Sequence, residues 1–325
     1  IGAGKQAKSL AGSFINTGEA RIVALSEVYP GKAEATMDKI KATYLKNPTL
    51  GVYADIPVYT DFRELLERKD VDAVVISTPD HWHAAMAVRA AAAGKDIYCE
   101  KPLALTVKEG RAMVDATRKY KRVFQTGSMQ RSWPEFRQTA ELIRNGYIGE
   151  VKSIKVNVGP PPIAYDLAAE EMPMGLDFEK WLGPNSSAVP FNSELAPPLS
   201  KDVFPNWRKY KEFGGGGMTD WGAHHNDIAY WAIGLLAPRD VESTVLVPPV
   251  AGGYTTFSEY EVRYTYANGT KLSIFTTKDD SIYGAKVKLD GQRNGIRFEG
   301  TDGWIWVNRD GIKASDPELL TKPLP

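Results

Sequence analysis

The chain lacks the features that mark several common classes of protein. Cys99 is its single cysteine, which excludes an internal disulfide and leaves the cellular compartment open. Its 325 residues carry 40 basic and 40 acidic side chains, so no net charge attracts nucleic acid or an anionic membrane. No apolar run approaches the roughly 20 residues of a membrane-spanning helix. We therefore expect a globular protein without nucleic-acid or membrane partners.

The first residues, Ile1–Gly4, resemble the end of a strand that enters a turn, without the strand itself. An export signal ahead of residue 1 would be missing from the sequence in the same way. We expect a cytoplasmic location by default, and a periplasmic one if such a signal preceded residue 1.

Strand and helix patterns alternate over the first half of the chain. The predicted strands cover residues 21–26, 58–59, 71–77, 96–99 and 122–125. The predicted helices cover residues 5–15, 31–45, 62–68, 83–93 and 107–120, with Asp61 as an N-cap. Repeated units of this length require right-handed crossovers between parallel strands. We predict a doubly wound α/β domain over residues 1–127.

The pattern changes near Gly149. Residues 151–158 alternate with period two, as in a sheet that has one solvated face. Asn268-Gly269 predicts a hairpin between strands at 260–266 and 271–276. The Pro-rich stretch 159–207 is too long for a simple connector and predicts a functional loop. We therefore predict a second, α+β domain over residues 128–325, with a mostly antiparallel sheet.

A short glycine turn opens the chain. Gly2, Gly4 and Ala7 fit the pattern G-x-G-x-x-G/A, and Lys5 and Gln6 begin a predicted helix. Such a turn lets the backbone and the helix N-terminus approach a pyrophosphate. Glu27 ends the next strand about 20 residues later, where an acid binds the ribose 2′-hydroxyl. The pattern predicts NAD as cofactor, with NADP less favoured, although the nearby Lys32 could receive a phosphate.

Two segments end neighbouring strands of the predicted parallel sheet. Thr78–His83 follows the strand 71–77, and Glu100-Lys101-Pro102 follows the strand 96–99. Ligands bind at this carboxyl edge in open α/β sheets. The spacing of His81 and His83 also occurs in zinc hydrolases, but side chains two apart on a helix diverge. We expect no metal site, and a lysine directed at a ligand.

A glycine run, 214–217, precedes an apolar helical pattern that contains the other two histidines. On a helix, Asp220, His224 and Asp227 fall at i, i+4 and i+7 and share one face. An imidazole beside a carboxylate is a natural general base near neutral pH. With Lys101 as a cation that polarises the alcohol oxygen, His224 supplies what alcohol oxidation needs.

Four segments together resemble the Gfo/Idh/MocA family of oxidoreductases, named for glucose–fructose oxidoreductase, inositol dehydrogenase and a rhizopine-catabolism protein. They are Gly2–Ala7, Thr78–Ala84 (TPDHWHA), Cys99–Thr106 (CEKPLALT) and Gly214–Asp227 (GGGGMTDWGAHHND). The resemblance implies an N-terminal Rossmann domain with a doubly wound parallel sheet, followed by an α+β domain with a large open sheet. In that family the broad sheet often forms dimers or tetramers, so the resemblance also implies a homo-oligomer.

The resemblance also implies roles for individual residues. Lys101 and His224 match the catalytic lysine and histidine of the family, and Asp220 matches its accompanying aspartate. Positions that line the nicotinamide side are matched by Thr78, Pro79, Asp80, His83 and Glu100. For the substrate, we expect Trp207 and Arg208, just before the glycine run, and then Arg131.

The sequence predicts an NAD-dependent oxidoreductase that oxidises a hydroxyl of a sugar, glycoside or cyclitol by hydride transfer. Two alternatives stay open. One is an NAD-dependent glycoside hydrolase that oxidises its sugar transiently, eliminates the aglycone and reduces the product. The other is a non-catalytic sugar-binding member of the family.

Overall fold

The computed structural model describes residues 1–50, 55–159, 167–185, 189–199, 204–234, 237–249, 253–277 and 294–324. The chain divides into two compact units. The first unit contains residues 1–127, 167–208 and 212–214, and the second contains residues 128–166, 209–211 and 215–325. In the described part of the chain, no helix is long and apolar enough to cross a membrane.

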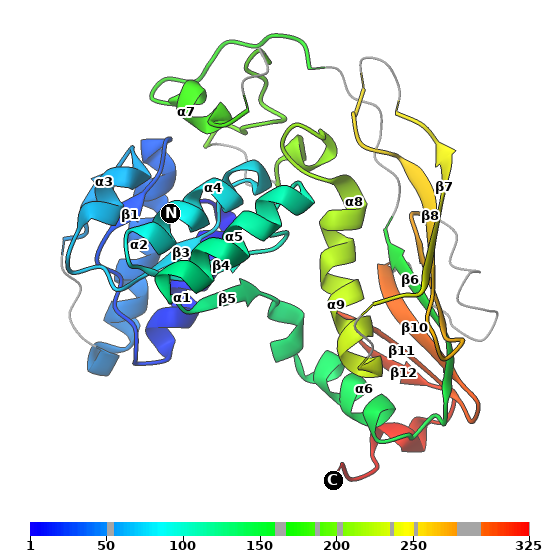
Figure 1. Cartoon of the computed structure of the whole chain (residues 1–325). Helices are drawn as coiled ribbons and strands as arrows, with labels where there is room; N and C mark the ends of the chain where they lie inside the picture. Colours follow the sequence, from blue (N-terminus) through cyan, green and yellow to red (C-terminus); the bar gives the residue numbers. More distant parts are fainter. Residues whose placement is uncertain are drawn as a thin grey trace. The chain divides into compact units, whose positions relative to one another are not determined.

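The first unit is built on parallel strands, which form a two-stranded and a three-stranded sheet (Figure 1). Its strands are β1 (Leu25–Ser26), β2 (Val58–Tyr59), β3 (Ala73–Ile76), β4 (Asp96–Glu100) and β5 (Phe124–Gly127). Gly2 N donates to Ser26 O (2.8 Å) and Ser77 N donates to Ile1 O (3.0 Å), so residues 1–2 lie between β1 and β3. The order β2-β1-(1–2)-β3-β4-β5 is that of a doubly wound domain, whose switch point lies beside the glycine turn. The predicted fold class is confirmed.

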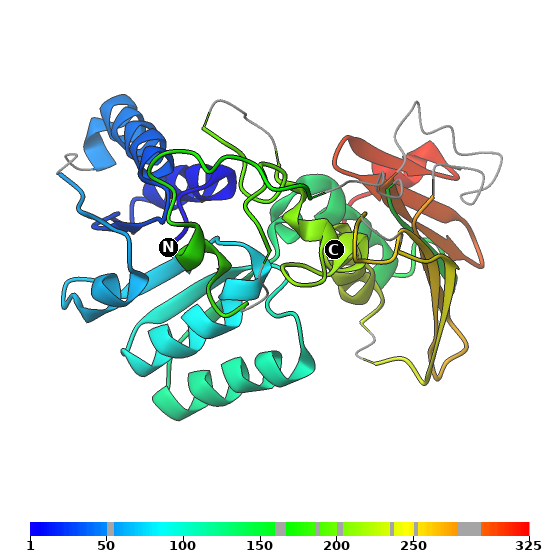
Figure 2. The same cartoon turned by 90° about the horizontal axis from the view of Figure 1, so that it is seen from above.

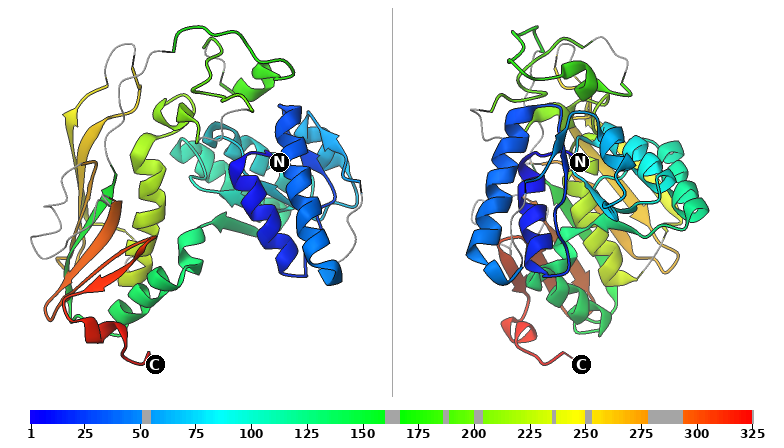
Figure 3. Two further views of the ribbon diagram at one scale, coloured as in Figure 1. Left: turned by 180° about the vertical axis from the view of Figure 1, so that it is seen from behind. Right: turned by 90° about the vertical axis from the view of Figure 1, so that its left-hand side faces the viewer.

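The helices of this domain cover both sides of its strands. They are α1 (Lys5–Asn16), α2 (Pro30–Lys46), α3 (Phe62–Glu67), α4 (Asp80–Ala92) and α5 (Val107–Tyr120), with a 3-10 turn at Pro48–Leu50. Helices α1 and α2 lie on one side, and α4 and α5 on the other (Figures 2 and 3). The Asp61 side chain caps α3 as predicted, by accepting from Arg63 N. Thr106 and Glu109 form a capping box that fixes the start of α5.

Several predicted boundaries in this unit are wrong. The strand expected over 21–26 contains only Leu25–Ser26, because its partner β2 is just as short. The strand expected over 122–125 is Phe124–Gly127, which pairs with β4. Helix α4 begins at Asp80, three residues before the predicted start, so both His81 and His83 lie in its first turn.

Part of the Pro-rich stretch also belongs to the first unit. We call its described residues, 167–185, 189–199 and 204–207, the strap. It contains helix α7 (Phe178–Leu182) and leads into the 3-10 turn Asn206–Lys209. Hydrogen bonds within the strap join Glu170 N to Phe191 O (2.9 Å) and Asn206 N to Glu194 O (2.8 Å). The strap is therefore an ordered substructure and not a bare connection.

The second unit is a seven-stranded sheet in the order β12-β11-β10-β6-β9-β8-β7. Its strands are β6 (Val151–Val158), β7 (Asp240–Val247), β8 (Glu259–Thr265), β9 (Lys271–Phe275), β10 (Asn294–Gly300), β11 (Trp304–Asn308) and β12 (Gly311–Ala314). The pair β6 and β9 is parallel and the other five pairs are antiparallel. The predicted hairpin at Asn268-Gly269 joins β8 to β9. The mostly antiparallel sheet is therefore confirmed.

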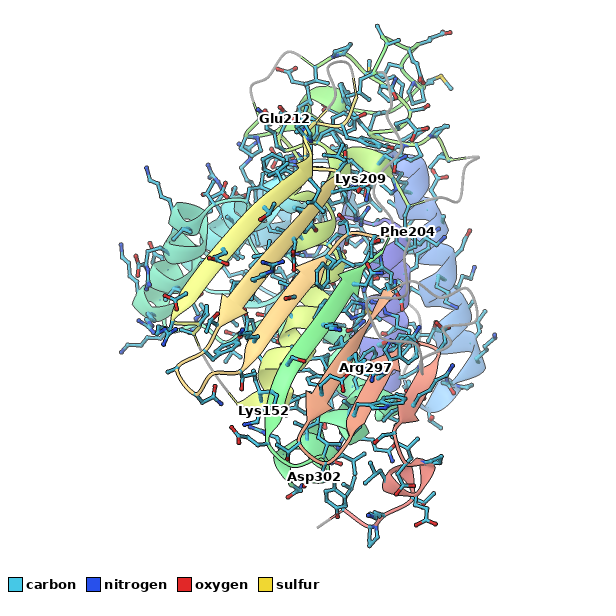
Figure 4. All side chains as sticks on the ribbon, turned by 90° about the vertical axis from the view of Figure 1, so that its right-hand side faces the viewer. Lys152, Phe204, Lys209, Glu212, Arg297 and Asp302 are labelled. Carbon is cyan, nitrogen blue, oxygen red and sulfur yellow. The ribbon has the colours of Figure 1, made fainter. Side chains whose placement is uncertain are left out.

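Helices cover one face of this sheet. They are α6 (Pro134–Arg144), α8 (Gly216–Thr219) and α9 (Trp221–Ile233), with short 3-10 turns at Met129–Ser132 and Pro317–Leu320. Helix α6 was not predicted. Buried side chains of α6 and α9, such as Phe136 and Ile228, pack on Ile154 and Phe298 of the sheet. Figure 4 looks onto the opposite face, where Lys152 and Arg297 are labelled.

Candidate active site

The glycine turn and the start of α1 form a cradle beside the switch point. Gly2 has φ +80°, and a Cβ there would lie 2.8 Å from the Thr78 methyl carbon, so a larger residue does not fit. Gly4 is the N-cap residue of α1 and has open space where a Cβ would stand. The amides of the first turn of α1 are thus accessible to an anion such as a pyrophosphate.

Glu27 is held firmly just after β1. Its Oε2 accepts from Ala3 N (2.7 Å) and its Oε1 accepts from Tyr29 N (3.0 Å). The same carboxylate faces Lys32, whose pKa is lowered by burial and raised in part by the attraction of Glu27. The glycine turn and the acid predicted to bind ribose are therefore linked directly through Ala3.

A cavity of about 330 Å³ in the first unit joins these groups. Six predicted cofactor residues and one predicted substrate residue line it: Gly2, Gly4, Lys5, Glu27, Thr78 and Pro79, with Trp207. The strap forms another part of its wall, through Leu176, Lys180, Trp181, Leu195, Pro197–Leu199 and Pro205. Apart from Trp207, the strap residues of this wall were missed by motif reasoning, although the length of the Pro-rich stretch was a signal.

Gln6 and Ala7 do not line the cavity. Gln6 instead joins α1 to the end of β4, because its Nε2 donates to Glu100 Oε1 (3.1 Å). Gly127 packs against the Glu100 side chain from β5, since a Cβ there would lie 2.8 Å from the carboxyl carbon. Glu100 thus supports the sheet edge from which Lys101 follows.

His83 contacts both of the segments that follow β3 and β4. Its Nδ1 lies 2.7 Å from Pro102 O and its Nε2 lies 2.9 Å from Thr78 O. A neutral imidazole donates to only one carbonyl at a time. Burial lowers the pKa of His83 to about 4 against the opposing effect of both carbonyls, and the positive charges of Lys101 and Arg208 lower it further. His83 is therefore a neutral side chain that links the segments after β3 and β4, close to Lys101 in the sequence.

His81 points elsewhere, as the helical spacing predicts. Its Nε2 lies 3.0 Å from Trp181 O on the strap, and its ring packs against Phe213. Burial lowers its pKa to about 4. Among the described residues there is no group of three or more His, Cys, Asp or Glu side chains that could hold a metal ion.

The motif Asp-x-x-x-His of the second unit lies where α8 meets α9. The expectation that Asp220 lies within a helix is wrong, because it is the N-cap residue of α9, with φ −81° and ψ −82°. His224 lies in the first turn of α9, and its ring centroid is 6.0 Å from that of Trp221. His225 is fully buried against Trp221 and Phe136, and burial lowers its pKa to about 3.

Asp227 forms a two-pronged ion pair with Arg131. Arg131 Nε donates to Asp227 Oδ2 (2.7 Å) and Nη2 donates to Oδ1 (2.6 Å). The Arg131 guanidinium also lies 5.5 Å from the ring centroid of Trp231. The predicted substrate residue Arg131 is therefore tied to the face of α9 that carries His224.

The predicted substrate residues Trp207 and Arg208 contact each other in the first unit. The Arg208 guanidinium lies 4.2 Å from the Trp207 ring centroid and 5.6 Å from that of Phe204. Trp207 is buried. The first unit thus holds Lys101, Trp207 and Arg208, while the second holds Arg131, Asp220 and His224.

A doubly wound domain with a glycine turn at its switch point defines a dinucleotide-binding protein. Residues 1–128 match the family model described as "Oxidoreductase family, NAD-binding Rossmann fold". Residues 163–296 match the model "Oxidoreductase family, C-terminal alpha/beta domain". The chain belongs to the Gfo/Idh/MocA family of oxidoreductases.

Several relatives have named activities. Levoglucosan dehydrogenase of Pseudarthrobacter phenanthrenivorans is 28% identical over 79% of this chain and 61% of its own length. Inositol 2-dehydrogenase of Salmonella typhimurium is 34% identical over 40% of this chain and 35% of its own length. The chain spans about a third to three fifths of the length of such curated relatives. A solved structure of levoglucosan dehydrogenase with NADH and levoglucosan has 25% identity and a TM-score of 0.62, covering 96% of this chain and 75% of that one.

Proposed function

We propose that the chain is an NAD-dependent oxidoreductase that oxidises a hydroxyl group of a sugar, a glycoside or a cyclitol. The observation that carries the proposal is the cavity at the switch point, where the glycine turn, the start of α1 and Glu27 come together. The names of the relatives support the substrate class, because levoglucosan is an anhydrosugar and inositol a cyclitol.

The charges beside the cavity support a dinucleotide with an unphosphorylated ribose. The Glu27 carboxylate would accept from the ribose hydroxyls while its other bonds to Ala3 N and Tyr29 N hold it in place. A 2′-phosphate would meet this negative charge, and Lys32, which already faces Glu27, would compensate only in part. We therefore propose NAD rather than NADP.

Three side chains would perform the chemistry. When bound, the nicotinamide supplies the acceptor for the hydride of the alcohol carbon. Lys101 would donate to the alcohol oxygen and stabilise its developing negative charge. His224 would accept the hydroxyl proton, since histidine is the most common general base in enzymes, and Asp220 would orient the ring.

Substitution of the two central residues tests this proposal. Lys101→Ala and His224→Ala are each expected to lower the rate of NADH formation at least about 100-fold, the lower range for loss of a general acid or base. NAD affinity, measured by calorimetry, should change by less than about threefold. Lys108→Ala, an exposed lysine on α5, is the matched control and should retain full activity. Turnover at the control rate in either variant would overturn the assignment.

A further inference from the structure

We propose that the strap is a gate over the dinucleotide cavity, so that NAD enters and NADH leaves only when the strap opens. This inference rests on the proposed use of NAD. It concerns the strap, which no family motif above includes, and its contacts within the first unit.

The strap lines the same cavity as the glycine turn. Leu176, Trp181 and Leu195 contribute to its wall, together with the Pro197–Leu199 segment. These side chains come from positions more than 150 residues after the turn. A dinucleotide seated against Gly4 and Glu27 would therefore have strap residues in the wall of its cavity, where many open α/β sheets leave a crevice.

Contacts with residues 1–127 fix the strap on either side of the glycine turn. At the β1 end, Asp177 N donates to Val28 O (3.0 Å), and Leu199 packs so closely on Gly31 that a Cβ there would overlap it. Next to the turn itself, Lys5 Nζ lies 4.9 Å from the ring centroid of Phe204. These contacts lie beside the predicted ribose and pyrophosphate positions.

At the β3 end, the carbonyl of Trp181 is bound twice. Trp82 Nε1 donates to it (3.0 Å), and His81 Nε2 lies at the same distance. Gly183 lets the strap backbone lie directly on the indole of Trp82, since a Cβ would overlap the ring. Because His81 and Trp82 belong to α4, the strap is anchored at both ends of the cavity.

The strap also has its own apolar core, so it would move as a unit. Trp181 stacks on Phe178 with a centroid distance of 5.4 Å, and Phe191 packs edge-on against Phe178. Leu195 is fully buried. Opening the cavity would therefore require several contacts to break together, which slows both the entry and the release of a ligand.

Exchange kinetics of the full chain test the inference without any sugar. Release of bound NADH, followed by its fluorescence after mixing with excess NAD, is expected to take longer than about a second. Leu199→Ala should weaken the contact with Gly31 and accelerate release about fivefold. It should accelerate binding by a similar factor, so that Kd changes by less than about twofold. Leu45→Ala, an exposed leucine on α2 outside the cavity, is the matched control.

Three results would contradict the inference in different ways. Release within milliseconds from the unchanged chain would overturn the gate and leave the proposed function intact. Faster release of Leu199→Ala without faster binding would show a plain contact with the cofactor instead of a gate. No binding of NADH at all would overturn the proposed function together with this inference.

Discussion

The four histidines lie in two segments that each begin a helix, and their surroundings differ. On α4, His81 and His83 both lie against backbone carbonyls, of Trp181 on the strap and of Thr78 and Pro102 at the sheet edge. On α9, His225 is buried among aromatic rings, and its Nε2 has no hydrogen-bond partner among the described residues. His224 precedes it and follows the N-cap Asp220.

This difference in surroundings bears on which histidines can act as a general base. A histidine held neutral by burial cannot take up a proton near pH 7, and the pKa values of His81, His83 and His225 are lowered to about 4, 4 and 3. The two histidine pairs, His81 with His83 and His224 with His225, thus have different surroundings although they look similar in the sequence. These lowered pKa values exclude His81, His83 and His225 as general bases near pH 7, and the proposed base is the fourth histidine, His224.

The largest effect expected from this comparison is a loss of stability in mild acid. His81, His83 and His225 bind protons less readily in the folded chain than in the unfolded one. The free energy of unfolding is therefore highest above about pH 6.5 and falls as the pH drops toward 4. Each should contribute a loss of about 2 kcal/mol between pH 7.5 and 5. Urea unfolding at pH 7.5 and at pH 5 measures this change in the free energy of unfolding.

The variant His225→Leu sharpens that experiment. It removes one of the three groups and should reduce the loss by about 2 kcal/mol. An unchanged pH dependence in this variant would contradict the assignment of His225 as a buried neutral group.

A smaller effect is expected from removing the contacts of His83 with the carbonyls on either side of it. His83→Leu leaves the carbonyls of Thr78 and Pro102 without this partner, which should destabilise the fold by about 1–3 kcal/mol. Because Pro102 follows Lys101, the rate of NADH formation should also fall, by about tenfold. His83→Gln keeps one donor and should recover part of the rate. If His83→Gln were as slow as His83→Leu, hydrogen bonding by His83 would not position Lys101.

Local patterns predicted much of the fold. The boundaries of α5 and β6 agree with the sequence, because Thr106 and Glu109 form a capping box and residues 153–158 alternate between polar and apolar side chains. The start of α4 was placed too late, because Pro79 suits the residue before a helix and moves the start to Asp80. Helix α6 was missed although Phe136, Ala140 and Ile143 give it a clear apolar face.

The site was predictable where a motif is local and not where it depends on distant contacts. The glycine turn and Glu27 lie within one strand–helix unit, so their spacing is visible in the sequence. The position of Asp220 depends on the break between α8 and α9, and the ion pair of Arg131 with Asp227 joins residues 96 apart. Docking of the strap on His81 and Trp82 depends on contacts about 100 residues apart, which no local pattern contains.

One measurement addresses the central claim most directly. The full chain would be incubated with NAD and with glucose, methyl glucoside and myo-inositol carrying deuterium on carbon, and the nicotinamide would be analysed by mass spectrometry. The account predicts that deuterium appears on the nicotinamide with at least one of these compounds, and that His224→Ala loses this transfer while His81→Gln retains it. Transfer by His224→Ala at the unchanged rate, or no transfer to a cofactor that is demonstrably bound, would contradict it.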